Sequence, residues 1–584
     1  MNLIKICKNG LLKLKSSLKR FPYSLSFSTL TATILIFIIN VESNFQTETI
    51  EILQRLAMTT ALGFPLFLCL KTLFEKKTIK MRYKTIIRLI STLVLVFYYF
   101  FLLKNINMVT VTKFIALNLT LYLLFLVIPY FYKKKNFELY IVKIFSRLAV
   151  TIIYSLVLYG GLSITLFTIN KLLNIPISGD LYISIWFAVI GIFAPIFMLA
   201  EIPEQNTKIN IREYPHVLKI LILYIIMPLI TIYTIILYIY FAKILIIQQW
   251  PQGLVAHLVL WYASLNVLTL FFISPLQTKN NWVKLFIHWL PKAIFPLLIM
   301  MFLAIGIRIN TYGITENRYY VVVLGLWIMG IMFYYVLSKK KNNVILLLTL
   351  AILAVLSTFG PWSSYSVSIH SQNNRFEKIV HKYDIVKNNT IIRNKVRITE
   401  NDQRQIKAIL RYFENNHKFN DIKYLPEDFK GKDTKKYFGF SYQGRFDYDK
   451  FQHFSYNLNL HKNNQVITTK NYDYLIQLSN HNNLFHITEN NLKVKLNNIT
   501  KEIIITQDSM EIYQQSLIPI LKEIHQKNKN ISKENLDLQK FIYRDQNENI
   551  NLKYIFKSFY GNYEKTNQNN INIDHVDFYL LIAQ

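Results

Sequence analysis

A series of long apolar segments, separated by short polar loops, dominates the first 360 residues of the chain. Each segment holds about 20 mostly apolar residues, enough for a helix to cross the ~30 Å hydrocarbon core of a bilayer. Unpaired backbone amides are too costly in lipid for any open structure, so these segments are expected to be helices. Eleven candidate spans lie at about 21–40, 52–74, 86–103, 110–131, 144–169, 181–200, 219–247, 254–275, 291–307, 319–338 and 343–359. Residues 1–360 are therefore predicted to form an α-helical polytopic membrane domain.

The distribution of charge tests this count of spans. The whole chain has a formal net charge of +32. Residues 1–360 contribute +24, from 34 Lys and Arg against 10 Asp and Glu, and residues 361–584 contribute +8, from 32 against 24. With a cytoplasmic N-terminus, 27 of the 34 cations fall on the cytoplasmic side of the eleven spans. This is the positive-inside pattern.

The same arithmetic bears on location and partners. An odd number of spans places the C-terminal part outside the cytoplasm, and the first span is expected to be retained rather than cleaved as a signal peptide. A nucleic-acid-binding protein would concentrate its basic excess on a soluble domain, so we predict no nucleic-acid partner. The expected location is the bacterial inner (cytoplasmic) membrane, with the lipid bilayer as the first partner.

Residues 361–584 are expected to form a separate α+β extracytoplasmic domain, because long apolar runs stop at Gly360. A first helix is indicated by apolar residues at helical spacing: Phe376, Ile379, Val380 and Tyr383. Thr399 is a candidate cap for a second helix with the apolar face Ile406, Ile409, Leu410 and Phe413. Strands are predicted at 437–442, 456–460, 472–478, 492–496, 502–506, 552–559 and 576–582, and a helix kinked by Pro519 at 509–526.

Motifs of common enzyme classes are missing from the sequence. It holds no Walker loop, nucleophile elbow, His-Glu-x-x-His or Cys-x-x-Cys. Nine of the twelve histidines lie after residue 360 without metal-ligand spacing, so we predict no metal site and no cofactor. Cys7 and Cys69 both lie in the first part, so the C-terminal domain has to fold without disulfides.

The most distinctive residues surround the last two spans. A Tyr-Gly-x-Thr-x-x-Arg-Tyr loop precedes a span, a Gly-Pro-Trp turn follows the next, and a Ser-Gln-x-x-Arg helix comes after it. The residues at these positions are Tyr312, Gly313, Thr315, Arg318, Tyr319, Gly360, Pro361, Trp362, Ser371, Gln372 and Arg375. In these motifs the chain resembles the bacterial membrane-protein family called domain of unknown function 4153, most closely over about 215–415. The resemblance implies a polytopic membrane protein without established chemistry, so it identifies no catalytic residue.

The candidate outer-face binding site consists of five of these motif residues and one neighbouring arginine: Arg308, Tyr312, Arg318, Trp362, Gln372 and Arg375. By the expected topology they lie on the same side of the membrane. One interpretation is that the loop docks the soluble domain, with Trp362 and the tyrosines as interface anchors. The other is that Arg308, Arg318 and Arg375 bind an anionic headgroup or the phosphate of a lipid-linked glycan.

Acidic residues in the first outer loop offer a more speculative site. Glu42, Glu48 and Glu51 follow the first span, and the overall layout is similar to that of lipid-linked sugar transferases. A carboxylate there could act as a base or hold a divalent ion. Acidic outer loops are ordinary, however, and these residues form no Asp-x-Asp.

Polar residues within the spans are few. Asn118, His257 and Asn266 are expected to make interhelical hydrogen bonds. No span has an Asp or Glu near its centre, which argues against a transporter built on a carboxylate relay.

The leading function hypothesis is a non-enzymatic envelope scaffold or partner-binding protein that displays an extracytoplasmic domain. Its partner would be another envelope protein. The alternatives are an envelope enzyme or carrier acting on a lipid-linked glycan or lipid headgroup at the outer face, and a solute transporter.

Overall fold

A computed structural model of the chain describes sixteen stretches of residues. They are 14–41, 47–76, 79–131, 136–203, 214–248, 254–278, 280–339, 341–392, 398–442, 451–458, 467–479, 483–497, 500–508, 510–528, 538–564 and 567–584. The chain forms two compact units, Met1–Ile391 with Asn420–Pro426, and Ile392–Phe419 with Glu427–Gln584. The boundary predicted after residue 360 marks the expected end of the membrane domain and stays a prediction.

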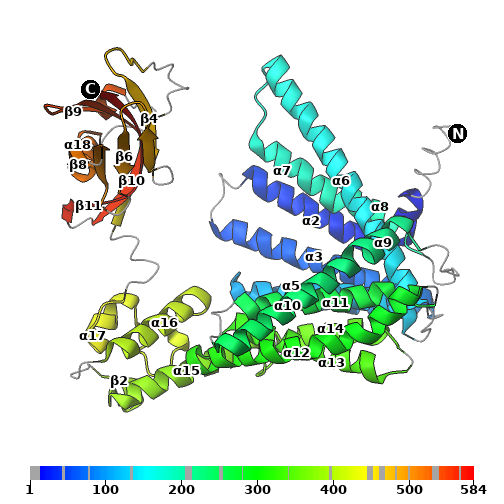
Figure 1. The fold of residues 1–584 in the computed structure, drawn as a ribbon. Helices are drawn as coiled ribbons and strands as arrows, with labels where there is room; N and C mark the ends of the chain where they lie inside the picture. The colour runs from blue at the N-terminus through cyan, green and yellow to red at the C-terminus, as the bar shows by residue number, and fades with distance from the viewer. Residues whose placement is uncertain are drawn as a thin grey trace. The chain divides into compact units, whose positions relative to one another are not determined.

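Long apolar helices make up most of the first unit (Figure 1). Among the described residues, ten helical segments are long and apolar enough to cross a membrane. They are α2 (Pro22–Val41), α3 (Thr47–Lys76), α4–η1 (Met81–Phe97, Tyr98–Leu102), α5–η2 (Met108–Val127, Ile128–Tyr130), α6 (Phe137–Leu173), α7–η3–α8 (Gly179–Ala188, Val189–Phe193, Ala194–Leu199), α9–η5–α10 (His216–Ile220, Leu221–Ile226, Met227–Ile247), α11–η6 (Leu254–Ile273, Ser274–Leu276), α12 (Asn281–Tyr312) and α13 (Glu316–Leu337). The predicted polytopic helical domain is confirmed.

The eleventh predicted span, 343–359, contains a shorter helix than expected. Its helix, α14 (Val344–Leu356), has 13 residues and a length of about 20 Å. At its start, Asn343 Oδ1 accepts a hydrogen bond from Tyr335 near the end of α13 (2.7 Å). Beyond its end, Ser364 Oγ bonds to Tyr320 near the start of α13 (3.0 Å). The segment from Asn343 to Ser364 therefore extends along the full length of α13, although α14 accounts for only part of this segment.

Two of the membrane-length helices contain a π-helical turn just before a proline. Pro195 follows η3 and Pro228 follows η5. Proline lacks an N–H and its ring clashes with the carbonyl four residues earlier, so the helix widens locally. The carbonyl freed in this way by Pro195 belongs to Gly191, and it accepts a hydrogen bond from Ser28 Oγ of α2 (2.6 Å). A Cβ on Gly191 would lie 2.5 Å from the Ala32 Cβ, so the close packing of these helices requires glycine.

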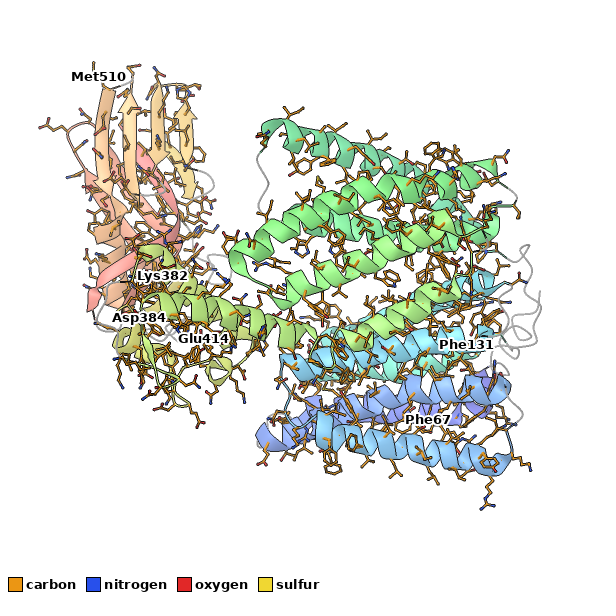
Figure 2. The ribbon with its side chains drawn as sticks, turned by 90° about the horizontal axis from the view of Figure 1, so that it is seen from below. Phe67, Phe131, Lys382, Asp384, Glu414 and Met510 are labelled. Atoms are coloured by element: carbon orange, nitrogen blue, oxygen red, sulfur yellow. The ribbon has the colours of Figure 1, made fainter. Side chains whose placement is uncertain are left out.

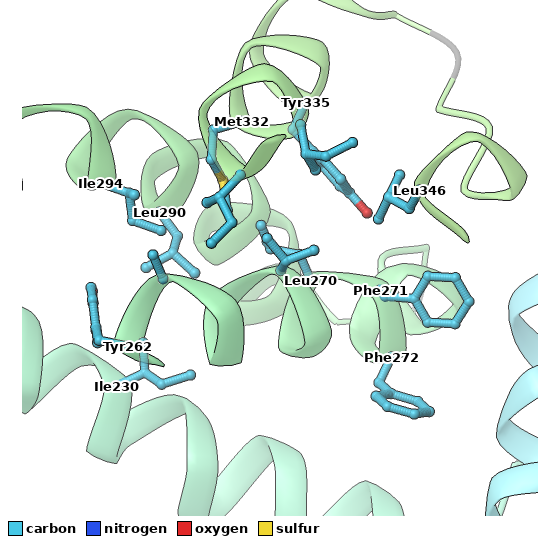
Figure 3. Packing of buried hydrophobic residues seen from close by; sticks show 14 of the residues in the cluster. Ile230, Tyr262, Leu270, Phe271, Phe272, Leu290, Ile294, Met332, Tyr335 and Leu346 are labelled. Atoms are coloured by element: carbon cyan, nitrogen blue, oxygen red, sulfur yellow. The ribbon is translucent and has the colours of Figure 1, made fainter. Parts of the chain in front are cut away.

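The main core of the membrane helices lies among α10–α14 and the start of α6. Figure 3 shows side chains of α10–α14 converging there, including Leu270, Ile294 and Met332, all fully buried. Smaller clusters join α2, α3, α4 and α5. Phe67 lies in one of them, and Figure 2 shows it within the N-terminal group of helices.

Amphipathic helices follow the last apolar helix. They are α15 (Ser364–Lys382) in the first unit, and α16 (Glu400–Asn416) and the short α17 (Thr434–Phe438) in the second. Between them, β1 (Val386–Lys387) and β2 (Thr390–Ile391) form a hairpin. The first two predicted helices are confirmed, with Thr399 as the N-cap of α16 and its predicted apolar face fully buried. Tyr383 is the exception, because α15 ends one residue before it.

The remaining part of the second unit consists of two antiparallel sheets and one helix. One sheet has the order β3-β10-β11-β4, with β9 also paired to β10, and the other has the order β5-β6-β7-β8. The elements are β3 (Phe451–Asn457), β4 (Tyr474–Ser479), β5 (Leu484–Ile487), β6 (Leu492–Leu496), β7 (Glu502–Gln507), β8 (Met510–Ser516), α18 (Leu517–Asn528), β9 (Ile542–Gln546), β10 (Asn551–Glu564) and β11 (Asn567–Ala583). Residues of both sheets and of α18 share one hydrophobic core. The predicted α+β class is confirmed.

Two predictions of local structure are wrong. Residues 437–442 contain the end of α17 and no strand, because their aromatic residues pack in short helical and turn segments. Residues 510–516 form strand β8, and the helix expected over 509–526 begins only at Leu517. Pro519 is the third residue of α18, where a missing N–H removes no intrahelical bond, so no kink follows.

Candidate functional site

The loop Gly313–Thr315, which joins α12 to α13, is the centre of the site. Gly313 has φ +70° and ψ 178°, a conformation essentially restricted to glycine. A Cβ at this position would lie 2.6 Å from Arg375 Cδ and 2.9 Å from Gln372 Nε2. Glycine therefore allows both the turn and the close approach of α15.

Three side chains on one face of α15 hold this loop. Ser371 Oγ accepts a hydrogen bond from the Ile314 N–H (2.9 Å). Gln372 Nε2 donates to the carbonyls of Tyr312 (3.1 Å) and Ile314 (2.9 Å), and Gln372 is 2% exposed. Arg375 Nη1 donates to the Tyr312 carbonyl (2.7 Å) and to Gln372 Oε1 (2.9 Å). We call Tyr312–Thr315 together with Ser371, Gln372 and Arg375 the α15 joint.

The turn between α14 and α15 is held at the same end of α13. Tyr319 OH donates to the Trp362 carbonyl (2.6 Å), and Ser364 Oγ bonds to Tyr320 OH (3.0 Å). Tyr365 OH bonds to a backbone carbonyl (3.1 Å) and a threonine hydroxyl (2.5 Å) of α5. The loop, the turn and the Ser-Gln-x-x-Arg helix are thus brought together in the folded chain.

A second face of α15 binds the segment Asn420–Pro426. Asn373 Nδ2 donates to a carbonyl of this segment (2.8 Å), and its Oδ1 accepts from the Lys423 N–H (2.8 Å). Tyr424 OH donates to Glu377 Oε1 (2.6 Å) and lowers the pKa of this carboxyl below its ordinary value. The carboxylate is therefore charged at neutral pH, and this contribution to stability is lost as the pH falls through the lowered pKa.

Three arginines lie near this end of the helices. Arg318 Nη1 donates to the carbonyls of Tyr312 (3.2 Å) and Gly313 (2.6 Å), and the positive charges of Arg308 and Arg375 act on its guanidinium. Burial lowers the pKa of Arg375, although arginine stays protonated at any physiological pH. Two exposed aromatic rings, Tyr312 (53%) and Trp362 (55%), lie on the same segments.

The acidic residues do not join this group. Glu48 and Glu51 lie in the first two turns of α3, and no ion pair or hydrogen bond within the described ranges links them to Arg308 or Arg318. Glu42 lies outside the residues that the structure describes. In the same described part of the chain, no group of three His, Cys, Asp or Glu is arranged to hold a metal ion.

The polar residues within the spans differ from expectation. Asn118 donates to the Phe114 carbonyl (3.0 Å) and Asn266 to the Tyr262 carbonyl (2.8 Å), each four residues earlier on its own helix. The predicted interhelical bonds are therefore wrong for these two asparagines, because each short amide side chain folds back onto a carbonyl of the preceding turn of its own helix. His257 is exposed and Asn266 is buried, so they lie on different faces of α11.

Sequence reasoning missed a polar network at the opposite end of α13. Asn343 is 1% exposed, and its Nδ2 donates to Glu138 Oε1 (2.6 Å) and Ser274 Oγ (3.3 Å). Its Oδ1 accepts from Tyr335 OH (2.7 Å). The network links α6, η6, α13 and the start of α14. Its members are far apart in the sequence and form no motif, so no local signal identifies them.

Together, the apolar helices and the C-terminal sheets define a multi-pass α-helical membrane protein that carries an α+β region. The chain belongs to the family described as Domain of unknown function (DUF4153), whose model matches residues 28–383. The match includes the first spans and ends directly after α15, so the α15 joint lies within the family region.

One relative from the curated proteins is an uncharacterised protein of Pasteurella multocida (strain Pm70). It is 29% identical over 196 residues, which are 33% of this chain and 33% of that protein. The match therefore spans about a third of the relative's length. No solved structure matches the chain.

Proposed function

We propose that the protein is a scaffold of the bacterial inner membrane that displays its C-terminal α+β domain on the extracytoplasmic side, where it binds another envelope protein. The observation that carries this proposal is that side chains of the α15 joint bond to the backbone of the protein's own membrane loop. The side chains of Gln372 and Arg375 donate to backbone carbonyls of the α12–α13 loop. Such bonds fix the position of a helix, which is what a displayed domain requires of its anchor.

The topology is supported by two independent features. In the part of the chain that the structure describes, ten membrane-length helices and the short α14, which with its flanking residues runs the full length of α13, add up to an odd number of crossings. The positive charge of the loops favours a cytoplasmic N-terminus. An odd number of crossings then carries α15 and everything after it to the extracytoplasmic side.

The binding of Asn420–Pro426 to the second face of α15 supports a role as anchor. This segment interrupts the second unit, and both of its ends continue into that unit. The hydrogen bonds of Asn373 and Glu377 therefore hold this segment, which is part of the first unit, on the same helix that the membrane loop holds.

A second candidate, an enzyme or carrier acting on a lipid-linked glycan or anionic headgroup, rests on the three arginines. Arg308, Arg318 and Arg375 place positive charge at one end of the helices, beside the exposed rings of Tyr312 and Trp362. Guanidinium groups and aromatic rings at a membrane surface suit phosphate and sugar recognition. Arg318 and Arg375 already donate to backbone carbonyls of the protein, which is the reason for ranking this candidate second.

Removal of the displayed sheets distinguishes the two candidates. Residues 451–584 contain a complete hydrophobic core, so they can be deleted as a block. The test is complementation of a strain in which deletion of the whole gene causes a phenotype. We expect residues 1–442 to reach the membrane at a normal level and still fail to restore the wild-type phenotype. Full-length Arg308→Gln is the matched variant and is expected to restore it.

The opposite pattern would favour the enzyme or carrier. Complete restoration by residues 1–442, together with failure of Arg308→Gln at normal protein level, would overturn the scaffold proposal.

A further inference from the structure

A cavity of about 570 Å³ lies among the membrane helices of the first unit, lined by α3, α5, α6 and α7–η3–α8. Its volume is within the range of small-molecule sites. The wall is apolar except for the hydroxyls of Tyr122, Thr151 and Ser155 and the indole N–H of Trp186. A cavity with so few polar groups is unsuited to a hydrated solute and suited to a hydrocarbon chain.

One of these hydroxyls lacks a partner. Ser155 is 5% exposed, and its Oγ has no hydrogen bond within the described part of the chain. The neighbouring Thr151 hydroxyl, by contrast, donates to the Arg147 carbonyl of its own helix (2.8 Å). A buried hydroxyl without a partner costs free energy, so the protein alone leaves this part of the wall unsatisfied.

Charged residues lie at one end of the same helices. Arg147 of α6 pairs with Glu201, which follows α8. Glu75 of α3 accepts hydrogen bonds from Nε and Nη2 of Arg20 (2.9 Å each) and pairs with Lys71 (3.5 Å). Three cations thus face two carboxylates, which leaves an excess positive charge.

The cavity begins within one helical turn of this charged layer. On α6, which runs antiparallel to α3, the lining residue Leu148 directly follows Arg147, and on α3 the lining residue Leu68 precedes Lys71 by three positions. Met198 stands in the same relation to Glu201. A cationic end above an apolar cavity matches the two parts of a phospholipid.

The helix opposite α6 adds a local irregularity to the wall. The π turn η3 ends just before Ala194 and Pro195, and both of these residues line the cavity. Turns of this kind are frequent at functional sites because they displace the following side chains. Interrupted helices also line transport sites, but those carry polar groups for their substrates, which this wall lacks.

We propose that this cavity binds one acyl chain of an anionic phospholipid from the surrounding bilayer, with the lipid phosphate at the Arg20–Lys71–Arg147 layer. The site is independent of the α15 joint and of the displayed domain. The bound lipid would fill space between α3, α5, α6 and α7–η3–α8 and so act as part of the packing of these helices.

Titration with defined lipids tests the proposal. The full-length protein is delipidated in detergent, titrated with phosphatidylglycerol, and its one-to-one lipid adduct is measured by native mass spectrometry. Ser155→Phe fills the cavity and should weaken the adduct about tenfold, the loss expected when roughly two methylene groups lose apolar contact. Ile153→Phe is the matched control, because Ile153 lies on the same helix, is 57% exposed and does not line the cavity. It should bind lipid like the wild type.

Two further measurements separate the contribution of the acyl chain from that of the lipid headgroup. Lys71→Gln should reduce the preference for phosphatidylglycerol over phosphatidylethanolamine, since it removes one of three cations. Glycerol 3-phosphate, which has the phosphate without the chain, should not displace the lipid. Ala194→Leu fills the cavity from the opposite helix and replaces Ser155→Phe if that variant does not fold.

Three outcomes would overturn the proposal. They are a wild-type protein that takes up no phosphatidylglycerol, cavity-filling variants that bind it as tightly as the wild type, and displacement of the lipid by glycerol 3-phosphate.

Discussion

Replacing Gly313 by Ala is expected to destabilise the protein by about 2–4 kcal/mol. The backbone at Gly313 has φ +70° and ψ 178°, which an L-residue rarely adopts, and the new Cβ would lie 2.6 Å from Arg375 Cδ. Either the loop or α15 has to move, so the hydrogen bonds of Gln372 and Arg375 to the loop are lost. We expect a lower thermal unfolding temperature in detergent and faster trypsin cleavage after Arg375 and Lys378.

The control for this change lies on the same helix. Gly306 also belongs to α12, and a Cβ there would have no atom within 4 Å. Because alanine is a better helix former than glycine, Gly306→Ala should leave stability unchanged or raise it by up to about 1 kcal/mol. Equal losses from the two substitutions would show that the α15 joint has no special part in stability.

Replacing Asn343 by Ala should destabilise the membrane helices by a similar amount, about 2–4 kcal/mol. Asn343 is almost fully buried and connects Glu138, Ser274 and Tyr335 through its amide. Its removal leaves the Tyr335 hydroxyl and the Glu138 carboxylate without this partner, and unsatisfied buried polar groups are more costly than the bond itself. Thermal unfolding measured by the loss of helical circular dichroism would report the effect.

Asn118→Ala is the matched change in this case. The Asn118 amide donates to a carbonyl of its own helix, four residues earlier, so its loss strands no group on another helix. We expect a change within about 0.5 kcal/mol. A network without structural importance would instead make the Asn343 and Asn118 variants equally stable.

The membrane helices could be predicted because lipid imposes a simple rule on sequence. Apolar length alone located the helices, whereas the orientation that loop charge indicates stays a prediction. Apolar length overestimates the helix in α14, which has only 13 residues. The rest of that predicted span is a turn held by hydrogen bonds to Tyr319 and Tyr320. In the C-terminal part, Pro519 suggested a kink within a helix, whereas it stands in the first turn of α18 directly after β8.

The candidate site was predictable as a set of residues, but not in its chemistry. The spacing of Gly313, Gln372 and Arg375 marked segments that the fold brings together. Side-chain type does not reveal whether an arginine points to a ligand or to a backbone carbonyl, because either partner satisfies a guanidinium. The network of Asn343 and the cavity beside Ser155 depend on contacts between distant segments, for which the sequence contains no local pattern.

The central claim is that the membrane helices display the C-terminal domain outside the cytoplasm, and cysteine labelling tests it most directly. In a chain with Cys7→Ser and Cys69→Ser, Met510→Cys introduces a thiol at a position that is 76% exposed, at the turn between β7 and β8 (Figure 2). Lys341→Cys places one in the α13–α14 loop, which is expected to be cytoplasmic. A membrane-impermeant maleimide should label the Met510 variant in intact cells, and the Lys341 variant only after permeabilisation. Protection of the Met510 variant together with labelling of the Lys341 variant in intact cells would contradict the account.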